Sequence, residues 1–153
     1  MIIRPYDSTM RQTFEKMLVT YFLTDLQSDI PEDILRGKLL DLIIRNAEQG
    51  INHLSLAFVG NAPVGFSIYQ IDSPDSDWCK RPGWGFIREL YIAEPYRRKG
   101  YGAALAAFTE NQLRALGAHH LYLTADDAAA FWEHCGFSNT HELCSNELEI
   151  MTK

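Results

Sequence analysis

The sequence predicts a single domain of the α+β class, residues 1–153, in which helices flank a mixed and mostly antiparallel sheet. Apolar residues recur at helical spacing over the first 50 residues, and from Leu54 onward their period changes to two. Strand and helix patterns follow one another in the order β-α-α-β-β-β-α-β-α-β, without an internal repeat or a linker. A chain of 153 residues has the length of one domain with one core.

The first half reads as a strand, two helices and a hairpin. Residues 2–6 form a short strand, and residues 9–22 carry apolar side chains at helical spacing. Asp29, with Pro31 in the first turn, starts a second helix that continues to Gly50. Two alternating runs on either side of a Gly-Asn turn predict the hairpin; they consist of Leu54, Leu56, Phe58, Val64, Phe66 and Ile68.

The second half begins with a polar loop, residues 72–83, that carries Trp78. A strand follows over residues 84–93, and its almost continuous apolar end indicates a central place in the sheet. The remaining patterns predict a helix, a strand, a short helix and a last strand, which cover residues 103–116, 119–124, 127–135 and 146–151.

The charge balance excludes some classes of function. Fourteen Lys and Arg against 20 Asp and Glu give a net charge of -6. We therefore expect no nucleic-acid partner, because phosphate contacts need an excess of cations. We also expect no membrane partner and a cytoplasmic location, since no apolar run reaches roughly 20 residues and no signal peptide is present. An acidic chain suits a cationic or amine-bearing partner.

The cysteines point to a reduced compartment and to no metal. There are three of them, and they include no C-x-x-C pair. A zinc set of His134, Cys135, His141 and Cys144 is conceivable, but its spacing fits no standard finger pattern. Packing of Cys135 at the end of a helix, next to Gly136, is the simpler interpretation.

A basic, glycine-bearing segment, Arg97-Arg98-Lys99-Gly100-Tyr101-Gly102, joins the strand over 84–93 to the next helix. The start of a helix presents unpaired backbone N–H groups and the positive end of its dipole. Glycines let the chain turn tightly, so that these N–H groups converge on one point. Such a segment suits a phosphate or pyrophosphate. Its spacing matches neither the nucleotide-binding P-loop nor the dinucleotide fingerprint.

Two blocks of the chain resemble the GNAT family of N-acetyltransferases. The run from Ile87 to Gly102 is similar to the acyl-CoA signature [Q/R]-x-x-G-x-[G/A] of that family, through Arg97, Gly100 and Gly102. Residues 128–137 resemble a second block, A-x-x-F-Y-x-x-x-G-F. The order of the elements also agrees over the whole chain, so the resemblance implies a GNAT-like fold.

The resemblance implies acetyl transfer from acetyl-CoA to an amine, directly and in a ternary complex. The pyrophosphate would lie on the backbone N–H groups of residues 98–103, and the pantetheine arm beside the strand that ends at Ile92. The N–H of Ile92 would polarise the thioester carbonyl. The residues to which the resemblance assigns acyl-CoA binding are Leu90, Tyr91, Ile92, Arg97, Arg98, Lys99, Gly100, Tyr101, Gly102, Ala103 and Phe131.

The chain departs from the family pattern at two positions. Trp132 stands where the family often has a tyrosine that acts as general acid, and an indole N–H gives up no proton. Ala125 stands where an asparagine often contacts pantetheine. A free CoA thiolate is a fairly good leaving group, with a pKa near the value of about 8.5 for free cysteine, so turnover need not depend on an acid. A non-catalytic acyl-CoA-binding or regulatory module remains the alternative function.

Glu89 is the candidate general base, because the amine must lose a proton before it attacks. The family often places a carboxylate at this position of the strand. The alternative is a structural role, in which Glu89 forms an ion pair with Arg88 or Arg81.

The acceptor is expected to be a small-molecule or peptide amine, and a homodimer is one assembly that the sequence permits. Carboxylates in segments that would rim the acceptor site favour a cationic amine over plain solvation of loops; they are Asp25, Asp29, Asp72, Asp75 and Asp77. Tyr21, Phe22, Trp78 and Trp84 would shape that site or belong to the core, and Tyr122 would line it or pack.

Overall fold

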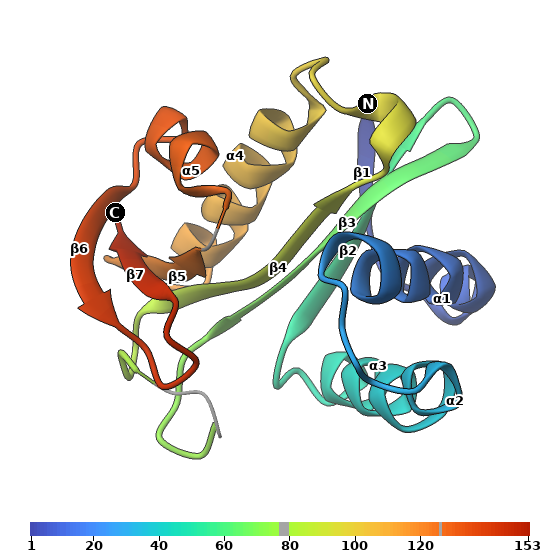
Figure 1. Ribbon diagram of the computed structural model, residues 1–153, viewed down its shortest axis with the longest axis horizontal. Coiled ribbons are helices and arrows are strands. Elements are labelled where there is room, and N and C mark those ends of the chain that lie inside the picture. The colour runs from blue at the N-terminus through green and yellow to red at the C-terminus, as the bar shows by residue number, and fades with distance from the viewer. Residues whose placement is uncertain (77–79, 126) are drawn as a thin grey trace. The chain divides into compact units, whose positions relative to one another are not determined.

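The computed structural model describes residues 1–76, 80–125 and 127–153. Its strands form one sheet with the order β1-β2-β3-β4-β5-β7-β6 (Figure 1). The pairs β1–β2, β5–β7 and β6–β7 are antiparallel, whereas β4–β5 is parallel. The strands are β1 (Ile2–Pro5), β2 (His53–Val59), β3 (Ala62–Ile71), β4 (Gly85–Ile92), β5 (Leu121–Ala125), β6 (Ser138–Leu143) and β7 (Glu149–Thr152). The predicted α+β class with a mostly antiparallel sheet is confirmed.

The helices follow the predicted order, with irregularities that the sequence pattern does not reveal. They are α1 (Arg11–Thr20), α2 (Glu32–Ile34), α3 (Leu40–Glu48), α4 (Tyr101–Ala115) and α5 (Ala129–His134). A π-helical segment, Tyr21–Asp25, extends α1, and another, Leu35–Leu39, joins α2 to α3. Within the described part of the chain, no helix is long and apolar enough to cross a membrane.

The chain divides into two compact units. Unit 1 contains residues 1–68 and 90–105, and unit 2 contains residues 69–89 and 106–153. The strands β3 and β4 and the helix α4 each contribute residues to both units. The organisation as one domain stays a prediction, and the two units are described one at a time.

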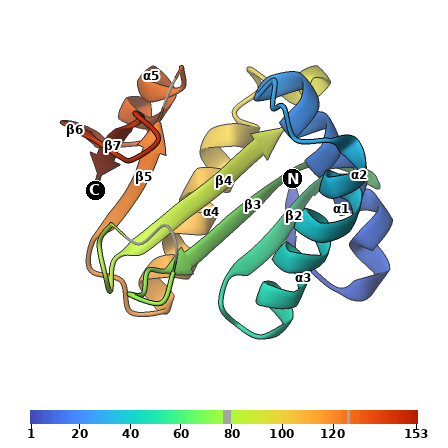
Figure 2. The ribbon, with the colours of Figure 1, turned by 60° about the horizontal axis from the view of Figure 1, so that its bottom comes forward.

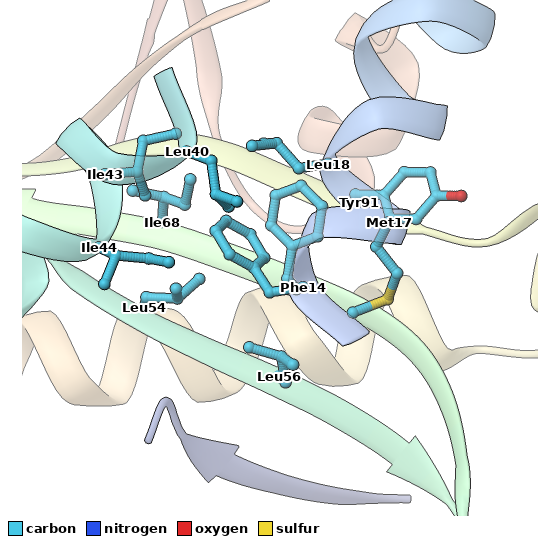
Figure 3. Close-up of a cluster of buried hydrophobic side chains, with 11 residues drawn as sticks. Phe14, Met17, Leu18, Leu40, Ile43, Ile44, Leu54, Leu56, Ile68 and Tyr91 are labelled. Atoms are coloured by element: carbon cyan, nitrogen blue, oxygen red, sulfur yellow. The ribbon is translucent and has the colours of Figure 1, made fainter. Parts of the chain in front are cut away.

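The main core of unit 1 lies between its helices and one face of β2 and β3. Phe14 and Leu18 of α1 are fully buried there, and Leu40 of α3 packs with them (Figure 3). The ring of Phe14 meets that of Phe66 edge to face, with the ring centres 5.2 Å apart. Figure 2 shows α1 and α3 over β2 and β3. The apolar periodicity of residues 9–50 therefore reports the buried sides of these helices.

The opposite face of β3 carries a second cluster, and the strand changes face at Gly65. Val64 packs with Ala57, Ile92 and Leu105, whereas Phe66 packs in the main core. In a regular strand, Val64 and Phe66 would share one face, so the alternation is interrupted between them. A Cβ atom at Gly65 would lie 2.2 Å from the backbone oxygen of Tyr91, which means that only glycine permits this approach of β3 to β4.

One buried cluster of unit 2 is built on two stacked aromatic rings. Phe86 of β4 stacks on Tyr122 of β5, with ring centres 4.5 Å apart and planes within 7°. Cys144 and Ile150 complete the cluster. Gly85 starts β4 close to β5, because a Cβ atom there would meet Leu121 at 2.5 Å.

One strand of unit 2, β6, was not predicted. All but one of its residues are exposed, and the exception, Asn139, is half-buried. The strand pairs with β7 only, at the edge of the sheet. An exposed polar edge strand has no apolar alternation from which it could be recognised.

Candidate functional site

The segment after β4, residues 97–102, leads through a turn into α4; we call it the basic loop. Arg98 and Gly100 both adopt left-handed conformations, with φ of 60° and 84°. The helix α4 begins at Tyr101, two residues before the predicted start, and the Ala104 N–H donates to the Gly100 carbonyl at 3.1 Å. The N–H groups before Ala104 therefore precede the helix's own hydrogen bonds and lie at the positive end of its dipole.

Two of the three cations of the basic loop are bonded to the protein itself. Arg97 donates through Nε to the Ile92 carbonyl at 2.7 Å and through Nη2 to Asp25 Oδ2 at 2.6 Å. Lys99 donates through Nζ to the Pro95 carbonyl at 2.9 Å. Their acceptors all lie outside the loop, so these hydrogen bonds connect the loop to the end of β4, to Pro95 and to Asp25. Among the described residues, no hydrogen bond or ion pair of the Arg98 side chain is found.

The side chains at the end of β4 belong to the core. Tyr91 packs in the main cluster, whereas Leu90 and Ile92 face the second one. Burial raises the pKa of Tyr91, the carboxylate of Asp25 adds to this rise, and Arg97 opposes it. Leu90 and Ile92 can consequently contact a ligand through their backbone rather than through their side chains.

The backbone at the end of β4 is held from two sides. The Ala93 N–H donates to the Val64 carbonyl at 2.8 Å, and the Ile92 carbonyl accepts from Arg97. Because successive N–H groups of a strand point to alternate edges, the N–H of Ile92 points to the edge away from β3. This orientation is the one that a hydrogen bond to a ligand at that edge requires.

A cavity of about 330 Å³ opens in unit 1 beside the Arg97–Asp25 ion pair. Met17 and Tyr91 line it from the end of the main core, where Figure 3 shows the Tyr91 hydroxyl directed away from the cluster. The full lining consists of Lys16, Met17, Thr20, Thr24, Asp25, Tyr91, Ala93, Glu94, Pro95 and Arg97. The cavity thus has an apolar inner part and a charged rim.

The remaining predicted site residues lie in unit 2. Glu89 is half-buried on β4, and Phe131 is half-buried on α5. Trp132 is buried and meets the rings of Phe131 and Phe137 edge to face, at 4.9 Å and 5.4 Å between centres. The tryptophan at the position of the family's tyrosine is therefore a packing residue of this helix.

The cations suggested as structural partners of Glu89 have other partners. Arg81 forms an ion pair with Glu142 at 2.5 Å, which holds the pKa of Glu142 below its usual value. Arg88 donates to the side-chain oxygen of Gln70 at 3.4 Å. These contacts do not decide between a base and a structural role for Glu89.

Several residues suggested for the acceptor site have structural roles instead. Asp72 is buried and accepts hydrogen bonds from the Tyr122 hydroxyl and from the N–H groups of Lys80 and Arg81. Asp25 is bound to Arg97. Tyr122 is fully buried, so it packs rather than lines a site.

The other acceptor candidates divide between core, surface and the undescribed part of the chain. Tyr21 and Phe22 pack against the main core. Trp84 packs against the aromatic cluster of unit 2. Asp29 and Asp75 are exposed, while Asp77 and Trp78 lie outside the described residues.

Sequence reasoning missed Asp25 as a partner of the basic loop. Asp25 and Arg97 are 72 positions apart in the sequence, and no local sequence pattern indicates that they are in contact. Within the ranges that the structure describes, no group of three or more His, Cys, Asp and Glu side chains could hold a metal ion.

The comparisons with known proteins agree with this geometry. The sequence profile of the Acetyltransferase (GNAT) family matches residues 13–137, and the chain belongs to this family. It is accordingly an N-acetyltransferase whose acyl donor is acetyl-CoA. No curated protein matches the sequence.

Solved structures of the family share the fold at low sequence identity. The PaiA N-acetyltransferase of Thermoplasma acidophilum, in complex with coenzyme A, is 19% identical, with 99% of this chain and 97% of that chain covered and a TM-score of 0.75. A ribosomal-protein-alanine N-acetyltransferase of Brucella melitensis is 18% identical, with 100% and 99% covered and a TM-score of 0.75. An aminoglycoside 6′-acetyltransferase of type Ii is 16% identical, with 100% and 96% covered and a TM-score of 0.75.

Proposed function

We propose that this protein transfers the acetyl group of acetyl-CoA directly to a primary amine, and that the basic loop binds the CoA pyrophosphate. The left-handed residues Arg98 and Gly100, placed immediately before the first turn of α4, carry this proposal. They support a turn whose N–H groups converge on an anion at the positive end of a helix. Lys99 and Arg97 add positive charge without needing to touch the phosphates.

The thioester would lie at the end of β4, where the N–H of Ile92 points away from β3. This N–H would donate to the thioester oxygen and stabilise the negative charge that develops on it. The amine nitrogen attacks the carbonyl carbon, a C–N bond forms, and the C–S bond breaks as the thiolate departs. Holding the amine and the thioester together would contribute several kcal/mol to lowering the barrier.

Glu89 would accept the proton that the attacking amine loses. It lies on β4, three residues before Ile92. The thiolate needs no dedicated acid, because its pKa is near the value of about 8.5 for a free cysteine. Burial of Trp132 among Phe131 and Phe137 supports a mechanism without an acid at that position.

For the acceptor, we propose a cationic amine. The net charge of -6 and the exposed carboxylates of Asp29 and Asp75 support this class of acceptor. Asp25 and Asp72 give it no support, because Asp25 is bound to Arg97 and Asp72 is buried. The aminoglycoside acetyltransferase among the structural neighbours is named for a substrate of this charge. A neutral or anionic acceptor with a clearly higher kcat/KM would reverse the choice.

Calorimetry with CoA tests the proposed loop through two glycines that differ only in position. Gly100 and Gly60 both have positive φ, at 84° and 59°, and a Cβ atom at either meets nothing within 4 Å. Gly100→Val and Gly60→Val therefore impose similar backbone strain. We expect micromolar or tighter CoA binding by the wild type, weaker binding by Gly100→Val and unchanged binding by Gly60→Val. Equal affinities of both variants would contradict the proposed pyrophosphate site.

A second assay separates catalysis from binding alone. The release of free CoA is measured from acetyl-CoA with polyamines, aminoglycosides, amino acids and peptide N-termini. Release with any of these amines identifies the acceptor class. CoA binding without release by any amine would favour the alternative function, a non-catalytic acyl-CoA-binding module.

A further inference from the structure

The guanidinium of Arg97 connects three parts of unit 1. It donates to the Ile92 carbonyl at the end of β4 and to Asp25 after α1, and it belongs to the basic loop. Its central carbon also lies 5.9 Å from the ring centre of Tyr91. Arg97 has several low-energy rotamers, so a single hydrogen bond to Ile92 would not by itself fix its plane. The carboxylate of Asp25 supplies the second fixed point.

Asp25 reaches Arg97 because the helix before it is not a regular α-helix. The Leu26 N–H donates to the Tyr21 carbonyl at 3.0 Å, five residues back instead of four. This π-helical segment changes the direction in which its last residues point. Single π turns inside helices are found frequently at functional sites. Here the segment ends on the residue that binds the basic loop.

The ion pair is at the wall of the cavity and not in the core. The side chains of Arg97 and Asp25 are 41% and 24% exposed. Both line the 330 Å³ cavity, together with Glu94 and Lys16. An exposed pair contributes little to folding. Its position at the root of the basic loop is therefore easier to explain by the geometry of that loop than by stability.

We propose that Asp25 is a positioning residue for acetyl-CoA, which acts by orienting Arg97. This inference rests on the proposed function, in which the basic loop holds the CoA pyrophosphate. Asp25 fixes the guanidinium, the guanidinium fixes the Ile92 carbonyl, and the loop that begins at Arg97 is thereby held in its binding conformation. Asp25 itself touches neither the phosphates nor the thioester.

The test is a double-mutant cycle with CoA affinity as the readout. Asp25→Asn, Arg97→Gln and the double variant are compared with the wild type by calorimetry. We expect Asp25→Asn to weaken CoA binding about two- to fivefold, the effect of losing an exposed ion pair. The same substitution should not change the CoA affinity further in the Arg97→Gln background, since Asp25 acts only by orienting Arg97.

Asp41→Asn is the matched control, because it removes another exposed Asp–Arg ion pair of unit 1, with Arg11. It should leave the CoA affinity unchanged. Asp25→Glu keeps the charge and should restore most of the affinity. In steady-state kinetics, Asp25→Asn should raise KM for acetyl-CoA by the same factor and change kcat by less than twofold.

The failure of this inference is distinguishable from that of the proposed function. If the wild type binds no CoA, both are overturned. If the wild type binds CoA but Asp25→Asn and Asp41→Asn have the wild-type affinity, the positioning role alone is overturned. An Asp25→Asn effect that persists undiminished in the Arg97→Gln background would also overturn it, because the effect would then not pass through Arg97.

Discussion

Gly65→Ala tests whether the contact between β3 and β4 sets the geometry of the site. An alanine Cβ atom at this position would lie 2.2 Å from the Tyr91 oxygen and 2.7 Å from Ile92 Cδ1. Ordinary contact begins at 3.4 Å, so the two strands would have to separate by about 1 Å. The atom that is met first belongs to the backbone and cannot rotate away. The strain therefore falls on the segment that we assign to the thioester.

The expected magnitude follows from two opposing effects. Overpacking of this kind costs about 1–3 kcal/mol, and a backbone obstacle favours the upper part of that range. Alanine also restricts the unfolded chain, which returns about 0.4–1 kcal/mol. We expect Gly65→Ala to lower the free energy of unfolding by about 1–2 kcal/mol. A displacement of this size near the reacting atoms can also reduce kcat by up to about 10²-fold.

Urea unfolding, with CoA release as the activity assay, measures both effects. Gly37→Ala is the control, since a Cβ atom there meets nothing within 4 Å and the position is helical. It should be neutral or more stable by up to about 1 kcal/mol. A Gly65→Ala variant with the stability and kcat of the wild type would refute the reasoning, because β3 would then yield without moving Tyr91 and Ile92.

Three further predictions concern Glu89, Tyr122 and His53. Glu89→Gln should lower kcat by about 10²–10⁴-fold with little change in acetyl-CoA affinity and with partial rescue at high pH; an unchanged pH–rate profile would exclude Glu89 as the base. Tyr122→Phe should cost about 1–2 kcal/mol in urea unfolding, because it removes one donor to the buried Asp72 but keeps the stacking on Phe86. Burial lowers the pKa of His53 below the unfolded value near 6.5, so stability should fall as the pH drops below about 6.5. Replacing His53 by Gln should flatten this part of the curve in urea titrations between pH 7.5 and 5.5, and an equally steep curve would contradict the assignment.

The elements with an apolar period could be read from the sequence. The first helix, the hairpin and α4 appear near their predicted positions because burial determines their pattern. The strand β6 carries no such pattern, since its side chains are exposed. Gly65 shows a different limit of prediction from the sequence. Val64 and Phe66 belong to one alternating run of the sequence, but in the structure they pack in different clusters, on either side of the close approach of Gly65 to Tyr91.

Some features of the candidate site could also be predicted from the sequence, and others could not. The glycine spacing and the basic charges of residues 97–102 are local features that can be seen in the sequence, whereas the left-handed backbone of Arg98 is known only from the structure. The roles of Arg97 and Asp72 depend on partners far away in the chain. Asp25 binds Arg97, and Tyr122 binds Asp72, so two carboxylates that looked available to an acceptor are already occupied. Composition alone does not distinguish a carboxylate that is free for a ligand from one that holds a loop.

The π-helical segment Tyr21–Asp25 makes the backbone conformation of this part of the chain important, and not only its side chains. A π turn contains one residue more than the α-helical path it replaces. If the same residues formed a regular α-helix, everything after them would be rotated by the angle of one residue, about 100°. Asp25 would then point away from Arg97, even though both side chains of the ion pair were still present. The ion pair thus depends on the π-helical conformation of this segment as well as on its two side chains.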